Sequence, residues 1–258
     1  MRIIVATHNE GKLKEIRRIL AEDLGETAQQ VELVSAGSLN LPDPVEDGVT
    51  FQENALLKAR DVAARTGCPA IADDSGLIVD VMGNAPGILS ARWAGEHGND
   101  KANNALLLAQ MADIPDEKRT ARFRCAAALV VPGAAEGAPY PIASETVELG
   151  EMPGVLLREA HGTNGFGYDP LFIPDDQPAR AVEAGRRFTS AEMTPEEKNA
   201  ISHRGKALKA LVPAVSALFS SSFACPDALQ CLIGIARRCY CRRCFRGAPE
   251  QVLYRETA

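Results

Sequence analysis

Residues 2–20 read RIIVATHNEGKLKEIRRIL and predict a strand that passes directly into a helix. The apolar run over residues 2–6 has the length of a short buried strand, and Asn9 is a favourable helix N-cap residue. Apolar residues then repeat at the spacing of one helical face, at Leu13, Ile16, Ile19 and Leu20. A strand followed at once by an amphipathic helix is typical of α/β folds.

Strand and helix patterns continue to alternate beyond this unit. Residues 31–35 predict a second strand, and Thr50 with Glu53 forms a capping box for a helix that ends at Gly67. The loop between them, residues 41–48, contains two prolines and a Glu-Asp-Gly turn. The next predicted elements are strands 69–73 and 77–81, separated by Asp74-Ser75-Gly76, and a helix over residues 100–112.

The period of the apolar residues changes to two after Thr120. Apolar residues from Ala121 to Cys125 alternate with arginines, which indicates a half-buried antiparallel strand. Residues 132–139 can turn this strand back into residues 140–149, and two further helices are predicted to begin at Thr194 and after Ser202. The predicted fold class is α/β, with a mixed central sheet in two lobes flanked by helices and an active-site cleft between the lobes.

The composition is that of an ordinary globular protein, with 258 residues, 46% hydrophobic residues and a formal net charge of −6. Because the chain is acidic, we expect neither direct nucleic-acid binding nor binding to an anionic membrane. The sequence contains no apolar run of about 18 residues that would predict a transmembrane helix. The N-terminal residues lack the pattern of a signal peptide, so we expect a cytoplasmic protein.

The last 38 residues differ from the rest, and we predict a domain over residues 1–220 and a non-catalytic Cys/Arg-rich extension over 221–258. This segment contains six arginines and three acidic residues. It also contains one Cys-x-x-Cys pair, Cys241 and Cys244. A structural zinc site normally has two such pairs, so we favour a disordered or poorly packed extension, or the product of a shifted reading frame. A zinc site remains an alternative. The extension contains five cysteines: Cys225, Cys231, Cys239, Cys241 and Cys244.

The segment from Thr7 to Lys12 has the features of an anion site. The free N–H groups at a helix N-terminus favour an anion, and Gly11 permits a close approach of a ligand to the backbone. Lys12 lies in the first helical turn, where its charge opposes the helix dipole unless an anionic ligand is bound. The alternative interpretation is an ordinary capped helix with a solvated lysine.

Acidic residues occur at two places: Glu46 lies in the loop just before the capped helix, and Asp73-Asp74 lies at a strand end. Carboxylate oxygens are the ligands that Mg²⁺ prefers, so these residues are candidate metal ligands. Adjacent strand residues point to opposite faces, so Asp73 and Asp74 are expected to have different roles. The alternative is a polar turn without a metal.

Basic and aromatic residues complete the candidate site. Phe166 stands between two glycines in a loop, where a purine can stack on its ring. Taken singly, this aromatic residue can equally belong to the core, and each basic residue can be solvated or structural. The basic residues singled out are Lys58, Lys198, His203 and Arg204.

Six segments of the chain, in this order, resemble the inosine triphosphate pyrophosphatase family, also called the non-standard purine NTP pyrophosphatases. The resemblance extends from about Arg2 to Ala217. It departs from the family in continuing beyond Leu218 and in having Asn164-Gly165 where Gly-Gly is common. The matching segments are ATHNEGK (6–12), FQENALLKAR (51–60), IADDSGL (71–77), GILSARW (87–93), GFGYDP (165–170) and SHRG (202–205).

The resemblance implies a role for each matching residue. Asp74 is the proton acceptor and, with Glu46, binds Mg²⁺; Lys58 contacts phosphates and Ser75 contacts substrate. The triphosphate is held by the segment Thr7, His8, Asn9, Glu10, Gly11 and Lys12. The base is packed and recognised by Phe166, Gly167, Tyr168, Asp169, Lys198, His203 and Arg204.

The same resemblance implies an enzyme that hydrolyses ITP, dITP and XTP to the monophosphate and pyrophosphate. Such an activity cleanses the nucleotide pool and keeps these bases out of DNA and RNA. It also implies a homodimer. Two alternatives are a related pyrophosphatase acting on pyrimidine or modified nucleotides and a module that binds nucleotides without turnover. The second predicts missing acidic residues, whereas Glu46 and Asp74 are present.

Overall fold

The first strand and helix form as the sequence predicts. In the computed structural model, which describes residues 1–220, strand β1 (Arg2–Val5) leads into helix α1 (Glu10–Leu24). The Asn9 side chain caps this helix by accepting hydrogen bonds from the backbone N–H groups of Gly11 and Lys12. The predicted Cys/Arg-rich extension, with its boundary and its zinc and disorder interpretations, lies outside the described residues.

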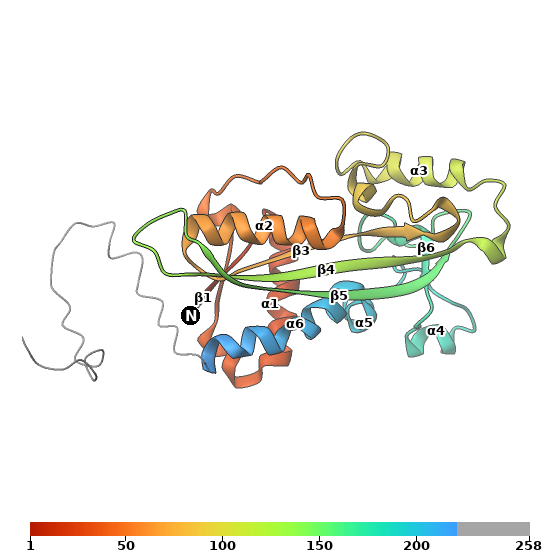
Figure 1. Ribbon diagram of the computed structural model, residues 1–258. Coiled ribbons are helices and arrows are strands. Elements are labelled where there is room, and N and C mark those ends of the chain that lie inside the picture. The colour runs from red at the N-terminus through yellow and green to blue at the C-terminus, as the bar shows by residue number, and fades with distance from the viewer. Residues whose placement is uncertain (221–258) are drawn as a thin grey trace, which may run out of the picture. The chain divides into compact units, whose positions relative to one another are not determined.

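The strands form one mixed sheet of six, in the order β2-β1-β3-β4-β5-β6. Strand β1 pairs in parallel with β2 and with β3, and every later neighbour pairs antiparallel. Figure 1 shows the long β3, β4 and β5 running across the described part of the chain. The mixed sheet of the predicted fold class is confirmed. The other strands are β2 (Glu32–Ser35), β3 (Ala70–Val79), β4 (Thr120–Pro132), β5 (Ile142–Leu156) and β6 (Phe172–Pro174).

Strand β3 is continuous, and the prediction of two strands split by Asp74-Ser75-Gly76 is wrong. The 13-residue β4 provides pairing partners along the whole of β3, including Ala126 for Asp74 and Arg124 for Gly76. A polar sequence that resembles a turn therefore stays extended, because its backbone groups are satisfied by the neighbouring strand. Gly76 is required here, since a Cβ atom would lie 2.4 Å from the carbonyl oxygen of Gly87.

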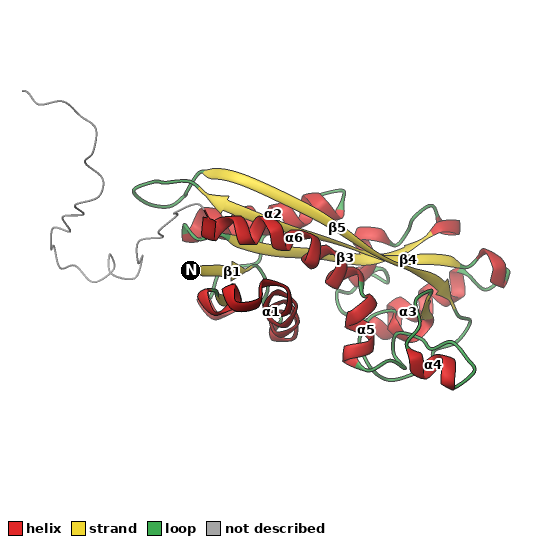
Figure 2. Ribbon diagram, turned by 90° about the horizontal axis from the view of Figure 1, so that it is seen from below, coloured by secondary structure: helices red, strands yellow, loops and turns green. Residues whose placement is uncertain are grey.

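Helices cover both faces of the sheet at the end that contains β1. Helix α2 (Phe51–Thr66) packs on one face with Ala55 and Ala59, while α1 and α6 (His203–Ser220) pack on the other. The views in Figures 1 and 2 agree with this arrangement. The Thr50 hydroxyl caps α2, but the Glu53 carboxylate accepts from the N–H of Val49 rather than that of Thr50.

A second core lies toward the other end of the long strands. There Leu77 and Val79 of β3 pack with Leu107 of α3 (Asp100–Gln110). Met111, which follows this helix, and Met152 of β5 belong to the same core. The remaining helices are α4 (Ala179–Glu183) and α5 (Pro195–Ile201). The two cores correspond to the two predicted lobes, which share β3, β4 and β5. Among residues 1–220, no helix has the length and apolar character needed to cross a bilayer.

Candidate active site

A cavity of about 900 Å³ opens where the two cores meet. Its wall includes the β1–α1 loop, the middle of β3, the loop of residues 164–169 and the junction of α5 with α6. The sequence-predicted residues that line it are Thr7, His8, Asn9, Lys12, Glu46, Lys58, Asp74, Ser75, Phe166, Gly167, Tyr168, Asp169, Lys198, His203 and Arg204.

Two predicted residues of the first loop do not line this cavity. The Glu10 carboxylate accepts a hydrogen bond from the Ser35 hydroxyl at 2.9 Å, which directs it toward β2. Gly11 contributes its backbone N–H to the Asn9 cap. The cavity-lining cation of this segment is Lys12, whose Nζ lies 3.4 Å from an Asp73 carboxylate oxygen.

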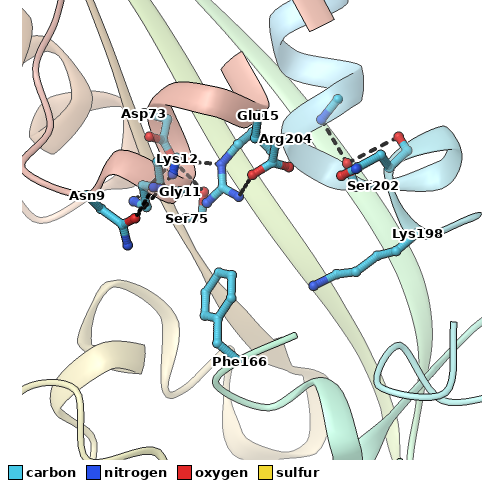
Figure 3. A network of polar contacts seen from close by, with 12 residues as sticks. Asn9, Gly11, Lys12, Glu15, Asp73, Ser75, Phe166, Lys198, Ser202 and Arg204 are labelled. Atoms are coloured by element: carbon cyan, nitrogen blue, oxygen red, sulfur yellow. Dashed lines mark hydrogen bonds and ion pairs between the residues drawn. The ribbon is translucent and has the colours of Figure 1, made fainter. Parts of the chain in front are cut away.

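Asp73 is the centre of a buried ion-pair network. Arg204 donates to its carboxylate from Nε at 3.0 Å and also contacts Glu15 from Nη1 at 2.8 Å (Figure 3). The Ser75 hydroxyl lies 3.3 Å from the same Asp73 oxygen. Burial alone would raise the pKa of Asp73, but the charges of Lys12 and Arg204 outweigh it and lower this pKa. Asp73 is therefore a fixed anion.

Asp74 points to the opposite side of β3 and meets a different group. Lys58 places Nζ 3.1 Å from Asp74 and 2.9 Å from Glu46, so one ammonium joins both carboxylates. Burial is the main cause that raises the pKa of Asp74, Lys58 opposes it, and Glu46 adds to it. Burial alone would lower the pKa of Lys58, but Asp74, Asp73 and Glu46 together raise it. Asp74 is thus a stronger proton acceptor than an ordinary aspartate.

Glu46 and Asp74 fit a magnesium site by the chemistry of their donor atoms. They present carboxylate oxygens that converge on one cation, the ammonium of Lys58. No group of three or more His, Cys, Asp or Glu side chains with metal-binding geometry occurs within residues 1–220. A site with one or two carboxylates suits Mg²⁺, which usually takes its remaining ligands from water and from substrate phosphates.

The aromatic part of the cavity is built around Phe166. The residue is 61% exposed, and Lys198 Nζ lies 5.2 Å from the ring centroid (Figure 3). Lys198 also contacts the Asp169 carboxylate at 2.5 Å, and this carboxylate accepts from the Phe166 N–H at 2.9 Å. The exposed ring is a platform on which a planar base can stack. Tyr168, by contrast, is buried and donates its hydroxyl hydrogen to the Ser90 carbonyl.

His203 lies at the start of α6, which the Ser202 hydroxyl caps by accepting from the N–H of Gly205. Its ring is buried and stacks on Phe123 at a centroid distance of 5.1 Å. Burial, reinforced by the charges of Arg204 and Lys198, lowers the pKa of His203 well below its ordinary value. The ring is therefore neutral near pH 7. Its Nδ1 is buried and has no hydrogen-bond partner among residues 1–220, which is unusual for a buried polar atom.

His8 lies at the rim of the cavity and contacts the loop that carries Glu46. Its Nε2 lies 2.8 Å from the Leu41 carbonyl oxygen, and its Nδ1 lies 2.6 Å from the Asp43 carboxylate. Both ring nitrogens are thus engaged with protein groups. This histidine joins the β1–α1 loop to the loop of residues 41–48.

Sequence reasoning missed several residues that shape the site. Glu15 stands three residues after Lys12, so helical spacing alone indicates that both share one face of α1. Asn54, which donates to Asp74 at 3.4 Å, stands four residues before Lys58 and has the same kind of signal. Asp100 and Asn104 contact the loop of Phe166, and no local pattern indicates such a contact.

The arrangement defines a class of protein: a nucleotide-binding enzyme with cations and acids at one end of a cleft and an exposed aromatic ring at the other. The chain matches the model of the Ham1 family over residues 3–214. It is 70% identical to the dITP/XTP pyrophosphatase of Bifidobacterium longum, in an alignment that covers 84% of this chain and 99% of the relative. The chain therefore belongs to the Ham1 family, and the resemblance stated from the sequence is confirmed.

Solved structures agree with this assignment. A HAM1 protein from Coxiella burnetii is 36% identical, with a TM-score of 0.67 over 84% of this chain and 99% of that one. A nucleoside-triphosphatase, or dITP/XTP pyrophosphatase, from Mycobacterium abscessus is 47% identical, with a TM-score of 0.62 over 83% of this chain and all of that one.

Proposed function

We propose that this protein hydrolyses non-standard purine nucleoside triphosphates, namely ITP, dITP and XTP, to the monophosphate and pyrophosphate. The observation that carries the proposal is the division of one cavity into an ionic end around Asp73 and Asp74 and an aromatic end around Phe166. A nucleoside triphosphate has the same division between a polyanion and a planar base. The dITP/XTP pyrophosphatase activity named for the relatives supports this choice, and no observation favours a pyrimidine or modified nucleotide.

At the ionic end, Lys12 and Lys58 are assigned to the phosphates. Both ammonium groups line the cavity and are held by the carboxylates of Asp73 and Asp74. Together with the N-terminus of α1, they would stabilise the negative charge that develops on the leaving pyrophosphate. The family resemblance implies base recognition for Arg204. Because Arg204 lies beside Lys12 in the Asp73 network (Figure 3), we assign it instead to the ionic end.

Asp74 is assigned as the proton acceptor. In the proposed reaction, water attacks the α-phosphorus, the bond to the bridging oxygen of pyrophosphate breaks, and the proton of the water passes to the Asp74 carboxylate. The position of Asp74 suits this role, because its carboxylate lines the cavity and is held in place by Lys58 and Asn54. Glu46 and Asp74 would hold Mg²⁺, which when bound neutralises phosphate charge.

At the aromatic end, selectivity follows from hydrogen bonding to the base edge. Hypoxanthine and xanthine carry an acceptor at O6, where adenine carries an amino donor. A donor that lines the cavity, either Lys198 Nζ or the His203 ring, would pair with O6 and would find no acceptor at this position of adenine; the buried His203 nitrogen would then remain unpaired. An unpaired buried polar group costs about 1–3 kcal/mol, which corresponds to a preference of roughly ten- to hundredfold.

The direct test is pyrophosphate release from ITP, XTP, ATP, GTP and UTP, measured with and without Mg²⁺. We expect kcat/KM for ITP and XTP to exceed that for ATP by at least about tenfold, with activity lost when Mg²⁺ is chelated. Preference for UTP would establish the alternative substrate class. Substitution of Lys198 or His203 should narrow the ITP-to-ATP ratio, whereas a uniform loss would move these residues to the phosphate site.

The finer assignments are also part of the proposal. We infer a cytoplasmic homodimer that uses Mg²⁺ and does not bind nucleic acid, supported by the family resemblance and the net charge of −6. Light scattering of the full chain tests the dimer. A gel-shift assay with duplex DNA tests the expectation that the protein does not bind nucleic acid.

A further inference from the structure

The loop that carries Phe166 is hydrogen-bonded to helix α3 at Gly167. The Gly167 N–H donates to the Asp100 carboxylate at 2.6 Å, and the Asn104 side-chain amide donates to the Gly167 carbonyl oxygen at 3.0 Å. Asp100 and Asn104 are four residues apart on α3 and therefore share one helical face. One backbone segment is thus held from both sides by one helix.

Core packing does not fix the position of the Phe166 ring, because the residue is 61% exposed. The ring contact given by the structure is with the Lys198 ammonium. The glycines on either side have left-handed backbone conformations, with φ of +77° at Gly165 and +62° at Gly167. Such positions impose no side-chain constraint on the loop. The direction of the ring therefore depends on the contact with Lys198 and on hydrogen bonds to the backbone of Phe166 and Gly167. Asp169, Asp100 and Asn104 make these hydrogen bonds.

Asn104 carries a second signal. Its Oδ1 atom is buried and has no hydrogen-bond partner within the described part of the chain, which is unfavourable for stability. A leucine of similar size would fill the same space without this penalty, so packing of α3 does not account for an asparagine here. The contact that does account for it is the amide donation to Gly167.

We propose that Asp100 and Asn104 are positioning residues that hold the Gly167 peptide and thereby aim the Phe166 ring at the purine. The proposal rests on the proposed function, because it assigns the ring to base stacking. Neither residue acts on the phosphates. Loss of either contact should weaken binding of a purine nucleotide and leave the phosphate end of the cavity unchanged.

The main test uses Asn104→Leu, with Lys101→Ala on the exposed surface of α3 as the matched control. We expect Asn104→Leu to raise KM for ITP about three- to tenfold, the effect of one lost hydrogen bond, with little change in kcat. Inhibition by inorganic pyrophosphate, which has no base, should not change. An equal shift in the pyrophosphate inhibition constant would overturn the proposal.

A double-mutant cycle separates positioning from general destabilisation. If Asn104 acts through Phe166, then Asn104→Leu should add nothing to the loss caused by Phe166→Ala. If the double variant instead showed a rise in KM equal to the product of the two single effects, the proposal would be overturned. If Asn104→Leu folds poorly, the same cycle can be measured with Asp100→Ala, which removes the hydrogen bond from the Gly167 N–H to the Asp100 carboxylate.

Hydrogen–deuterium exchange tests the attachment without any substrate. Backbone amides of residues 164–169 should exchange faster in Asn104→Leu than in the unmodified protein or in Lys101→Ala. Unchanged exchange would overturn the attachment whatever the enzyme hydrolyses. Faster exchange with an unchanged KM for ITP would overturn the positioning role. Failure of the unmodified protein to hydrolyse ITP would instead contradict the proposed function.

Discussion

Asp73 and Asp74 are neighbours on β3, yet their pKa values shift in opposite directions. Asp73 is buried and meets Lys12 and Arg204, so its charge is fully compensated. Asp74 shares a single lysine with Glu46, so compensation is incomplete and burial raises its pKa. The comparison shows that one residue type serves two purposes when a strand alternates its faces: one carboxylate holds the cations in place, and the other is free to take a proton.

The largest effect is expected from Asp74→Asn. Removing a positioned proton acceptor should reduce kcat for ITP by about 10²- to 10⁴-fold. The fold should persist, because the amide keeps the shape of the side chain. The measurement is kcat for pyrophosphate release together with the thermal unfolding midpoint. Retention of more than about a tenth of the activity would show that Asp74 is not the acceptor.

Asp73→Asn should mainly lower the free energy of unfolding, whereas Asp74→Asn should mainly lower kcat. Removing the buried anion leaves Lys12 and Arg204 without their shared partner, and breaking such a pair destabilises by about 3 kcal/mol or more. Urea unfolding should show this loss, and kcat should fall less than in Asp74→Asn. A stable Asp73→Asn protein with kcat as low as Asp74→Asn would contradict the division between the two aspartates.

The two lysines should separate the phosphates from the rest of the nucleotide. Lys12→Ala and Lys58→Ala each remove a cation from the ionic end, so each should weaken triphosphate binding by roughly tenfold or more. Binding of inosine monophosphate should change less, because both lysines are assigned to the outer phosphates. Calorimetric titration with the two ligands measures the difference. Equal losses for both would contradict the assignment.

A smaller effect concerns His203 and the pH dependence of stability. Its folded pKa lies below the unfolded value of about 6.5, so the unfolded state binds more protons at mildly acidic pH. The contribution of neutral His203 to the free energy of unfolding is complete above about pH 6.5. It is lost as the pH falls below the unfolded pKa, by up to about 1.4 kcal/mol per pH unit. The Asp73 contribution is lost only below about pH 4.

His203→Gln should therefore reduce the change in unfolding free energy between pH 7.5 and pH 5.0. His97→Gln, at an exposed position in the same protein, serves as the control. Identical pH dependence in His203→Gln and the unmodified protein would show that His203 is not the titrating group.

The smallest effect is expected from removing residues 221–258. The family match ends at residue 214, and the six matching segments end at Gly205. Activity and the unfolding midpoint should remain nearly unchanged in the truncated chain. Unfolding on truncation, or loss of one bound zinc per chain with the segment, would place this part of the chain in the folded structure.

The sequence was sufficient for features that depend on local spacing. Three such features are confirmed by the structure: the Asn9 cap, the starts of α2 and α5, and the period of two at the start of β4. Each arises from interactions within a few residues. The continuity of β3 could not be predicted in this way, because its polar residues remain extended only when β4 pairs with them.

The site shows the same limit. Motif order identified the cavity-lining residues that include Lys12, Asp74 and Phe166. The pairing of Arg204 with Asp73 joins residues 131 positions apart, and the contacts of α3 with Gly167 join residues more than 60 apart. Such pairings depend on the register of the whole sheet, and no local pattern contains them.

The most direct test of the account is hydrolysis of ITP in ¹⁸O-labelled water, with mass spectrometry of both products. We expect one labelled oxygen in inosine monophosphate and none in pyrophosphate, because the water activated by Asp74 attacks the α-phosphorus while pyrophosphate leaves. Label in pyrophosphate, or formation of inosine diphosphate with inorganic phosphate, would contradict the proposed arrangement of the cleft.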